Sequence, residues 1–288
     1  MECLVNTRLG IHIEELTFHY DEEIPALNGV TLEIPDNAYL AIVGQNGSGK
    51  TTLVKHMNGL LKPTTGRVWV YGQDTRTTPV GQLAKIVGYV FQNPDHQIFC
   101  ATTREEISFG PRNLGLDAAT VRARTEEALE LFGLTPYAET PPAVLGFGLR
   151  RKVSVASVYA MRPRVLILDE PTMGLDWRSA CELMRLLDEL HHQGHTIILV
   201  SHDMRIVAEH APEMLVMHEG RILAQGPTRE VFQRAEDLDR AQIAPPQITQ
   251  LGQRLSPWGL PRDLLTVGEF VEAYERLRID RSRSEIAP

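Results

Sequence analysis

Three short, mainly apolar runs lie along the chain, at residues 39–43, 165–168 and 196–200. Each run has the length of a strand, and each is followed directly by glycine or polar residues. A strand can be apolar on both faces only where both faces are buried, as in the interior of a parallel sheet. The pattern therefore predicts three central strands whose carboxyl ends carry polar side chains.

Between these predicted strands, apolar residues recur at the spacing of a helix. The apolar face behind the first run consists of Leu53, Val54, Met57, Leu60 and Leu61. Strand and helix patterns alternate over residues 10–92 and again over 164–226, whereas residues 93–160 are mostly helical. Within that stretch, Asp117 can cap a helix that Gly133 closes. The order predicts an α/β fold with a parallel sheet flanked by helices and a helical subdomain at about residues 93–160.

The pattern changes again near residues 244–246, where two prolines mark a break. Beyond it we expect two short amphipathic helices, the second opened by a capping box of Thr266 and Glu269. Their apolar positions are Ile248, Leu251 and Leu255 in the first helix, and Val267, Phe270, Val271, Tyr274 and Leu277 in the second. Two such helices cannot form a core of their own. The chain thus divides into a main domain, residues 10–240, and an appendage, residues 241–288, for packing or dimerisation.

A glycine-rich segment follows the first apolar run and matches the pattern G-x-x-x-x-G-K-[ST]. Glycines let the backbone turn so that successive N–H groups point at phosphate oxygens. Lys50 supplies a positive charge for the β and γ phosphates of a nucleotide, and the Thr51 hydroxyl can be a ligand of Mg²⁺. The helix after the loop would present its N-terminus to the phosphates, which favours anions. The predicted nucleotide-binding residues are Gly44, Gln45, Asn46, Gly47, Ser48, Gly49, Lys50, Thr51 and Thr52.

Two carboxylates, Asp169 and Glu170, end the second apolar run. Asp169 is placed to hold Mg²⁺, and Glu170 can polarise an attacking water as a general base. His202 follows the third run. A lone histidine after a strand is usually structural, but beside a phosphate loop and a carboxylate pair it is expected to contact the γ-phosphate. Tyr20 lies in a strand-like stretch before the loop, where its ring either stacks on adenine or fills the core.

This ordered set of motifs resembles the nucleotide-binding subunits of ATP-binding-cassette (ABC) transporters. Gln92 matches the glutamine of that family's Q-loop, and residues 174–176 match its D-loop. Within the family, the chain is similar to the ATPase subunits of energy-coupling factor (ECF) importers, which serve vitamins and cobalt or nickel ions. That narrower likeness is carried by residues 89–99, 108–115, 245–251 and 265–269. The resemblance covers about residues 10–280.

The resemblance implies a P-loop ATPase of ABC type that uses ATP and Mg²⁺. Thr51, Gln92 and Asp169 would surround Mg²⁺, and Gln92 would act with Glu170 and His202 in hydrolysis. Three kinds of partner are implied: a second ATPase subunit, an integral-membrane coupling subunit and a substrate-binding membrane subunit. The segment from Asn93 to Phe99 and nearby helices would dock the membrane partner, with the chain peripheral on the cytoplasmic face of the cell membrane. The choice of vitamin or metal ion would lie in another chain.

One family motif is degenerate. The ABC signature reads Leu-Ser-Gly-Gly-Gln at the start of a helix, and the corresponding residues here are Leu145, Gly146, Phe147, Gly148 and Leu149. A hydroxyl donor is missing, a bulky ring stands where a backbone must approach a phosphate, and an apolar group replaces an amide. In the family two subunits pair head to tail, so each site uses one chain's phosphate loop and the other's signature. The resemblance therefore implies an asymmetric dimer with a different ATPase subunit.

Three cations, Arg150, Arg151 and Lys152, follow the degenerate motif at the start of the predicted helix. Positive charge is unfavourable at a helix N-terminus unless an anion is near. We therefore expect some attraction for phosphate to persist there.

The composition narrows the choice of partner. The formal net charge of −8 over 288 residues argues against a nucleic-acid-binding surface. Cys3, Cys100 and Cys181 show no metal or disulfide spacing, which fits a reducing compartment. No signal peptide is evident in the first residues, and no apolar run reaches the roughly 20 residues that span a bilayer. The histidines at 191, 192 and 195 are expected to follow a helix end rather than to bind a metal.

Two other functions compete with an importer ATPase. A cassette ATPase acting on nucleic acid would carry a long coiled-coil or zinc insertion between the Q-loop and the signature, and the gap from Gln92 to Leu145 holds neither. An ATP-binding regulatory subunit of a heterodimer would bind ATP without hydrolysing it, against which the intact Glu170 and His202 argue.

Overall fold

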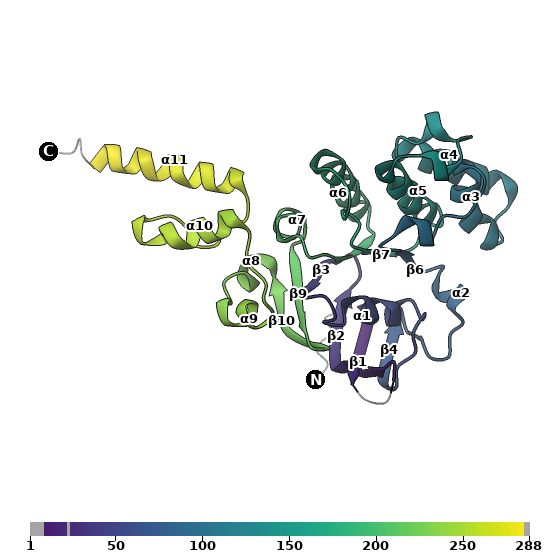
Figure 1. The fold of residues 1–288 in the computed structure, drawn as a ribbon, viewed down its shortest axis with the longest axis horizontal. Coiled ribbons are helices and arrows are strands. Elements are labelled where there is room, and N and C mark those ends of the chain that lie inside the picture. Colours follow the sequence, from purple (N-terminus) through teal and green to yellow (C-terminus); the bar gives the residue numbers. More distant parts are fainter. Residues whose placement is uncertain (1–8, 22–23, 285–288) are drawn as a thin grey trace, which may run out of the picture.

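A parallel sheet forms the centre of the protein, as seen in a computed structural model that describes residues 9–21 and 24–284. Over these residues the sheet has six strands in the order β10-β9-β3-β8-β7-β6 (Figure 1). Its strands are β3 (Tyr39–Gly44), β6 (Val87–Val90), β7 (Val165–Asp169), β8 (Thr196–Val200), β9 (Glu213–His218) and β10 (Arg221–Pro227). All pairs are parallel except the hairpin of β9 and β10. The predicted α/β fold and its three central strands are confirmed.

The three central strands bring their carboxyl ends to one edge. Every residue of β3, β7 and β8 is buried, which is why their sequences are apolar on both faces. In the register, Val200 lies opposite both Ile42 and Asp169. The polar residues that follow the strands consequently meet at this edge, which is where parallel α/β sheets bind their ligands.

A second, antiparallel sheet covers one face of the first. Within the described residues its order is β2-β1-β4-β5, with β1 (Leu9–His19), β2 (Pro25–Pro35), β4 (Thr65–Val70) and β5 (Gln73–Asp74). Its inward side chains share an apolar core with α1 (Lys50–Met57) and with alternate residues of the central sheet, such as Leu40 and Ile42. The expected strand–helix alternation from residue 10 is therefore wrong for the first stretch, because β1 and β2 pair directly with each other.

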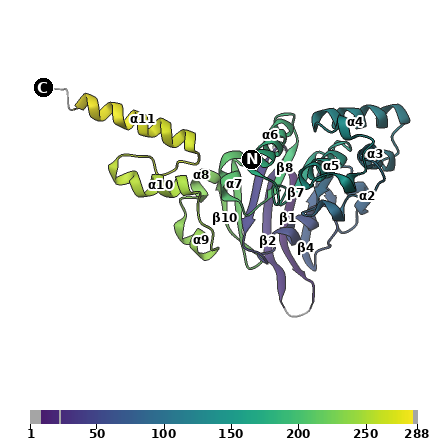
Figure 2. The same ribbon diagram turned by 45° about the horizontal axis from the view of Figure 1, so that its top comes forward.

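The helices pack on the opposite face and at one end (Figure 2). They are η1 (Pro94–His96), α3 (Thr103–Asn113), α4 (Ala118–Leu131), η2 (Thr135–Tyr137), η3 (Pro142–Val144), α5 (Phe147–Tyr159), α6 (Trp177–His192) and α7 (Met204–His210). The short helix α2 (Val80–Leu83) differs, because its Leu83 belongs to the core that α1 shares with the antiparallel sheet. Asp117 caps α4 by accepting from the N–H groups of Ala119 and Thr120, and Gly133 follows the helix at φ +65°. The cap predicted from the sequence is thus confirmed.

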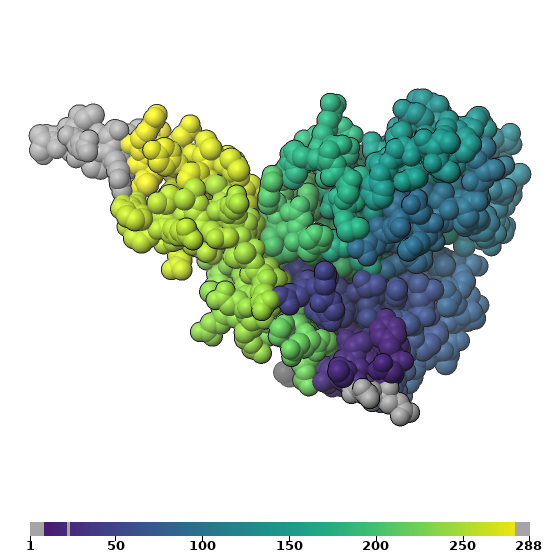
Figure 3. Space-filling view, viewed as in Figure 1, coloured from purple at the N-terminus to yellow at the C-terminus, as the bar shows by residue number. Residues whose placement is uncertain are grey.

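The C-terminal helices extend to one side of the molecule, as Figure 3 shows. They are α8 (Thr228–Val231), α9 (Ala235–Arg240), α10 (Gln247–Leu255), η4 (Ser256–Trp258) and α11 (Val267–Ser284). At 18 residues, α11 is longer than the short helix expected. Arg229 binds the Glu269 carboxylate at 2.6 and 3.2 Å and so joins α8 to α11.

Glu269 closes the start of α11 in a way that differs slightly from the predicted capping box. Its N–H donates to Thr266 Oγ1 at 3.2 Å, as expected, but its carboxylate accepts from the N–H of Leu265 rather than of Thr266. Hydrogen bonds from the Arg229 guanidinium lower the pKa of the Glu269 carboxyl, with a smaller contribution from the Leu265 N–H.

Within residues 9–21 and 24–284, no helix combines the length and the apolar composition that a bilayer crossing requires.

Candidate active site

The loop between β3 and α1 depends on its glycines. Gly44 has φ +152°, and a Cβ there would lie 2.4 Å from the carbonyl oxygen of Met217. Gly49 has φ +100°, and its Cβ would lie 2.7 Å from the carbonyl oxygen of Ala26. Any larger residue at either position would collide with the backbone of a neighbouring strand. Gly47 also has a positive φ of +81° but faces open space, so only its backbone conformation calls for glycine.

Lys50 folds back over this loop. Its Nζ donates to the carbonyl oxygens of Gly44 and Gln45, both at 2.8 Å. Burial lowers the pKa of the ammonium, while the charges of Glu170 and Asp169 act in the opposite direction. The ammonium is thus held at the mouth of the loop. A bound anion there would replace the two carbonyl oxygens as its hydrogen-bond partner.

Asp169 accepts two hydrogen bonds at the end of β7. The hydroxyls of Thr51 and Tyr89 donate to its Oδ2, at 2.9 and 2.8 Å. Burial, followed by the charge of Asp169, raises the pKa of the Tyr89 phenol, so Tyr89 stays a donor. Tyr89 is absent from the predicted site residues. Its only signal is its place on β6 beside β7, where it pairs with Ile167.

The same oxygens fit a magnesium ion. Thr51, Asp169 and Gln92 line one cavity, and each offers an oxygen donor, which Mg²⁺ prefers. The Gln92 amide nitrogen donates to Met173 Sδ at 3.4 Å, which leaves its amide oxygen for a cation. The cavity therefore brings together the three residues that were expected around Mg²⁺, and their role as its ligands stays a prediction.

Glu170 and His202 form a pair at the same edge. His202 Nδ1 lies 2.8 Å from Glu170 Oε2. The Glu170 side chain is nearly buried, whereas that of His202 is 63% exposed on the turn after β8. Glu170 has φ +49°, a left-handed conformation that is costly for a residue with a side chain. Its N–H donates to the carbonyl oxygen of Val200, which holds this conformation and aims the carboxylate along the edge.

Tyr20 lies one residue beyond the end of β1 rather than inside a strand. Its side chain is exposed, and its hydroxyl lies 3.2 Å from Thr52 Oγ1. Phe18 meets the ring edge-on, with centroids 4.9 Å apart. The ring therefore does not fill the core, and it borders the cavity that holds Lys50 and Thr51.

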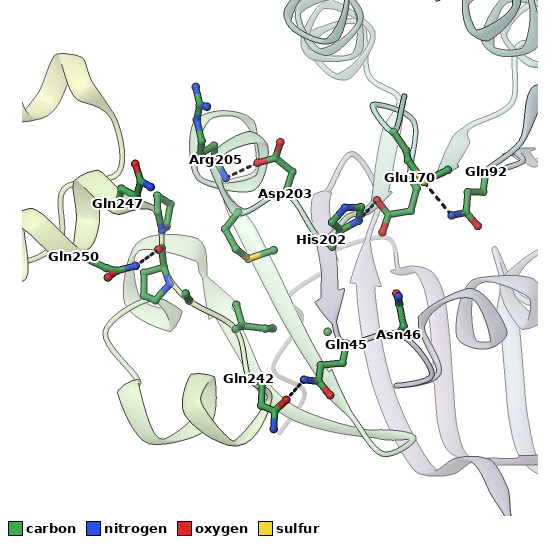
Figure 4. Close-up of a pocket in the computed structure, with 17 residues that line it drawn as sticks. Gln45, Asn46, Gln92, Glu170, His202, Asp203, Arg205, Gln242, Gln247 and Gln250 are labelled. Atoms are coloured by element: carbon green, nitrogen blue, oxygen red, sulfur yellow. Dashed lines mark hydrogen bonds and ion pairs between the residues drawn. The ribbon is translucent and has the colours of Figure 1, made fainter. Parts of the chain in front are cut away.

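A broad cleft opens above these residues (Figure 4). One wall carries Gln45, Gln92, Glu170 and His202, and the other is the chain segment 242–250 that leads into α10. The Gln45 and Gln242 side chains are hydrogen-bonded across it. The second wall was not predicted, because nothing local in the sequence indicates that this segment returns to the phosphate loop.

The degenerate segment lies away from this cleft. None of its five residues is among the described residues that line the cleft or the cavity. Gly146 is the N-cap of α5 without a side-chain cap, and a Cβ there would meet nothing within 4 Å. Phe147 packs against Gly174, whose added Cβ would lie 2.9 Å from the ring. Leu145 is buried, Leu149 packs against the main core, and Gly148 lies near Leu175.

The cations after this segment already have partners. Lys152 Nζ binds Glu182 at 3.2 Å, and Arg150 Nε lies 3.5 Å from Asp95. The Arg151 side chain is fully buried. The expectation that these three residues retain an attraction for phosphate is wrong for Arg151, because its guanidinium points into the protein.

The histidines show no metal site. His191 and His192 form the last turn of α6 rather than following it, and His195 binds the Pro163 carbonyl at 2.8 Å through Nδ1. Over the described part of the chain, no group of three or more metal-ligating side chains converges. Cys100 and Cys181 form no disulfide with any described residue, and Cys3 lies outside that part of the chain.

Comparison with known proteins identifies the architecture. A sequence profile described as ABC transporter matches residues 27–173. The chain is 46% identical over 253 residues to the energy-coupling factor transporter ATP-binding protein EcfA2 of Symbiobacterium thermophilum, covering 86% of this chain and 88% of the relative. It is 43% identical over 266 residues, 92% of its length, to a protein of Caldanaerobacter subterraneus named as an ABC transporter ATP-binding protein. The chain spans only 46% of that second relative.

A solved structure agrees. The structure of cbiO1 from Clostridium perfringens, described as part of the ABC transporter complex cbiONQ, superposes with a TM-score of 0.74 at 35% identity. The match covers 86% of this chain and 99% of that one.

Proposed function

This chain belongs to the ABC transporter family, and from that premise we propose that it is the ATP-binding and ATP-hydrolysing subunit of an ECF-type importer, energising uptake through an integral-membrane partner. The observation that carries the proposal is the meeting of Lys50, Asp169, Glu170 and His202 at one sheet edge. Relatives named as ECF ATP-binding subunits and a neighbour from a cbiONQ complex support the transport assignment.

Each residue at the edge has a proposed task. The loop N–H groups and Lys50 bind the phosphates of ATP at the start of α1. Thr51, Asp169 and Gln92 would hold Mg²⁺, which supplies charge neutralisation of the phosphate oxygens. Glu170 accepts a proton from the attacking water, and His202, bound to it, orients the water against the γ-phosphate.

The test is ATP hydrolysis by the purified chain together with the membrane proteins that co-purify with it. We expect Mg²⁺-dependent release of phosphate and recovery of at least one integral-membrane subunit. A single-turnover measurement separates hydrolysis from mere binding. Bound ATP that is never cleaved, with membrane subunits present, would contradict the enzymatic part of the proposal.

We expect Tyr20→Ala to weaken ATP binding several-fold and to reduce discrimination between ATP and GTP. The exposed ring beside the phosphate cavity suits stacking on adenine, which is worth on the order of 1 kcal/mol. Tyr20→Phe is the matched control, since it keeps the ring and removes only the contact with Thr52. Binding is measured by isothermal titration with both nucleotides. Equal ATP affinity in Tyr20→Ala and the unaltered chain would leave Tyr20 without this role.

We infer that the membrane partner docks at the segment from Asn93 to Phe99 and at the neighbouring helices. Phe99 and Phe109 are exposed there and meet edge-on at 4.7 Å, leaving an apolar surface. The same segment carries the exposed carboxylate of Asp95, which Arg150 approaches to 3.5 Å.

We expect Asp95→Arg to reduce co-purification of the membrane subunit several-fold and to leave ATP affinity unchanged. The exposed ion pair with Arg150 is worth only about 0–1 kcal/mol, so its loss should unfold neither η1, which carries Asp95, nor α5, which carries Arg150. The double variant Asp95→Arg/Arg150→Asp restores the pair with reversed polarity. If the swap restores co-purification of the membrane subunit, Asp95 is required for its ion pair with Arg150 and not for direct contact with the membrane subunit.

We further propose that the chain is peripheral on the cytoplasmic face of the membrane, and that the cargo is a vitamin or a transition-metal ion. The names of the relatives, energy-coupling factor transporter ATP-binding proteins, support a place beside a membrane transporter. We also propose that a substrate-binding membrane subunit and a second ATPase subunit complete the complex.

A further inference from the structure

Arg151 is a buried cation that serves no ion pair. Its side chain has no exposed surface, and among the described residues it forms no salt bridge. Its two terminal nitrogens donate instead to main-chain carbonyls, to Phe91 at 2.7 Å and to Gln92. Both acceptors belong to the segment that ends in the candidate magnesium ligand.

This arrangement is energetically expensive. Burial lowers the pKa of the guanidinium to about 10, which still leaves it charged at neutral pH, while the charge of Asp169 acts in the opposite direction. Arg151 is also the fifth residue of α5, near the positive end of the helix. Its Nε has no hydrogen-bond partner within residues 9–21 and 24–284. An apolar residue of similar size would remove these costs. The gain that offsets them must therefore come from the two carbonyl groups that Arg151 binds.

Arg151 holds the main chain directly behind the Gln92 side chain. Gln97 also ties this segment to α5, since it accepts from the Phe91 N–H at 3.2 Å and donates to the Ser154 carbonyl at 2.7 Å. These are neutral bonds, whereas those of Arg151 are charge-assisted and lie next to the functional side chain. The Gln92 side chain then extends into the cavity shared by Thr51 and Asp169.

Phe147 supports Arg151 from the degenerate segment. The guanidinium carbon lies 5.6 Å from the centroid of the ring, within the range of a cation–π contact. The same ring also lies beside Gly174, in the segment that follows Glu170. A continuous path of contacts therefore runs from the Gln92 carbonyl through Arg151 and Phe147 to Gly174.

We propose that Arg151, with the Phe147 ring beside it, is a positioning residue that sets the Gln92 amide oxygen for Mg²⁺ in this chain's own nucleotide site. The bulky residue that disables the signature toward a partner thus has a use within the chain. This inference rests on the proposed function, since it assumes that ATP and Mg²⁺ bind at the phosphate loop.

The test measures binding of trinitrophenyl-ATP to the full-length chain, in EDTA and over a range of Mg²⁺ concentrations. In Arg151→Met we expect the Mg²⁺ concentration for half-maximal strengthening of binding to rise roughly ten- to a hundredfold, as for other groups that orient a metal ligand. Affinity in EDTA should not change, because the loop and Tyr20 are untouched. For Arg151→Lys this Mg²⁺ concentration should lie between those of the unaltered chain and of Arg151→Met, since one ammonium cannot reach both carbonyls as the guanidinium fork does.

The double-variant cycle with Gln92→Ala separates positioning from general destabilisation. If Arg151 acts through Gln92, Gln92→Ala alone shows the same rise, and adding Arg151→Met raises it no further. Phe147→Leu keeps an apolar group against Gly174 but loses the ring face, and it should show a smaller rise. Arg122→Met, an exposed arginine on α4, is the control and should behave as the unaltered chain.

Two results would overturn the inference. One is an unchanged Mg²⁺ dependence in both Arg151→Met and Arg151→Lys, and the other is full additivity with Gln92→Ala. If Arg151→Met does not fold, Arg151→Lys and Phe147→Leu still decide the question. Absence of Mg²⁺-dependent nucleotide binding in the unaltered chain would instead refute the proposed function itself.

Discussion

Glu170→Gln is expected to lower the rate of ATP hydrolysis by about 10²–10⁴-fold, the usual effect of losing a positioned general base. The carboxylate lies at the end of β7 in a left-handed conformation, with His202 Nδ1 2.8 Å away. Glutamine has nearly the same shape and keeps an oxygen for His202, but it cannot take a proton from water. ATP affinity should be retained, since Lys50 and the loop are unaltered. Together with a second ATPase subunit that carries an intact signature, ATP-bound dimers should accumulate because the nucleotide is not cleaved.

Single-turnover phosphate release measures the rate, and size-exclusion chromatography with ATP measures the dimer. Glu209→Gln, at an exposed position on α7, is the matched control and should leave both unchanged. His202→Ala should lower the rate less, since the base remains although its water is poorly oriented. Turnover close to normal in Glu170→Gln would remove Glu170 from the role of base.

The central sheet and the phosphate loop were predictable because their signals are local. An apolar run of strand length, then a glycine-rich turn, then a helical face already specify β3, the loop and α1. Parallel strands that end together explain why Asp169 and Glu170 meet the loop although more than a hundred residues separate them. The cap at Asp117 was likewise predictable, because a cap depends on residues within one turn.

The missed features depend on contacts between distant segments. Tyr89 reaches Asp169 only because β6 pairs with β7, and the wall at residues 242–250 reaches Gln45 only through the path of the C-terminal helices. The length of α11 was underestimated because its second half is charged and has no apolar period, although nothing in it breaks a helix. Arg151 was expected at the start of a helix with an attraction for phosphate, and its burial follows from how α5 packs against the Q-loop segment.

The degenerate signature leads to the second large prediction, that this chain hydrolyses ATP well only with a different ATPase subunit. In a homodimer, both sites would use the degenerate signature. Phe147 and Leu149 would face both γ-phosphates, and neither site would have the hydroxyl that Gly146 lacks. Each lost charge-assisted hydrogen bond costs about 1.5–3 kcal/mol, roughly ten- to a hundredfold in closure on ATP. A partner with an intact signature would complete one strong site on this chain's Lys50 and Glu170.

Mixing two variants of this chain tests the signature in trans. The first carries Gly146→Ser, Phe147→Gly and Leu149→Gln together with Lys50→Ala, so it offers a restored signature but cannot use its own loop. The second is the unaltered chain. Gly146 faces open space and Phe147→Gly only removes bulk, while Leu149→Gln removes an apolar contact with the core, so a thermal melt should accompany the assay.

We expect the mixture to hydrolyse ATP at least tenfold faster than either variant alone, because only mixed dimers pair a restored signature with a working loop. Since Lys50→Ala silences the restored chain's own site, any effect of Phe147 on its own Gln92 does not enter the result. Lys50→Ala without the restored signature is the control and should not stimulate the unaltered chain. Full turnover by the unaltered homodimer, with no gain on mixing, would mean that the degenerate segment still binds the γ-phosphate of the other subunit. A different ATPase subunit would then not be needed.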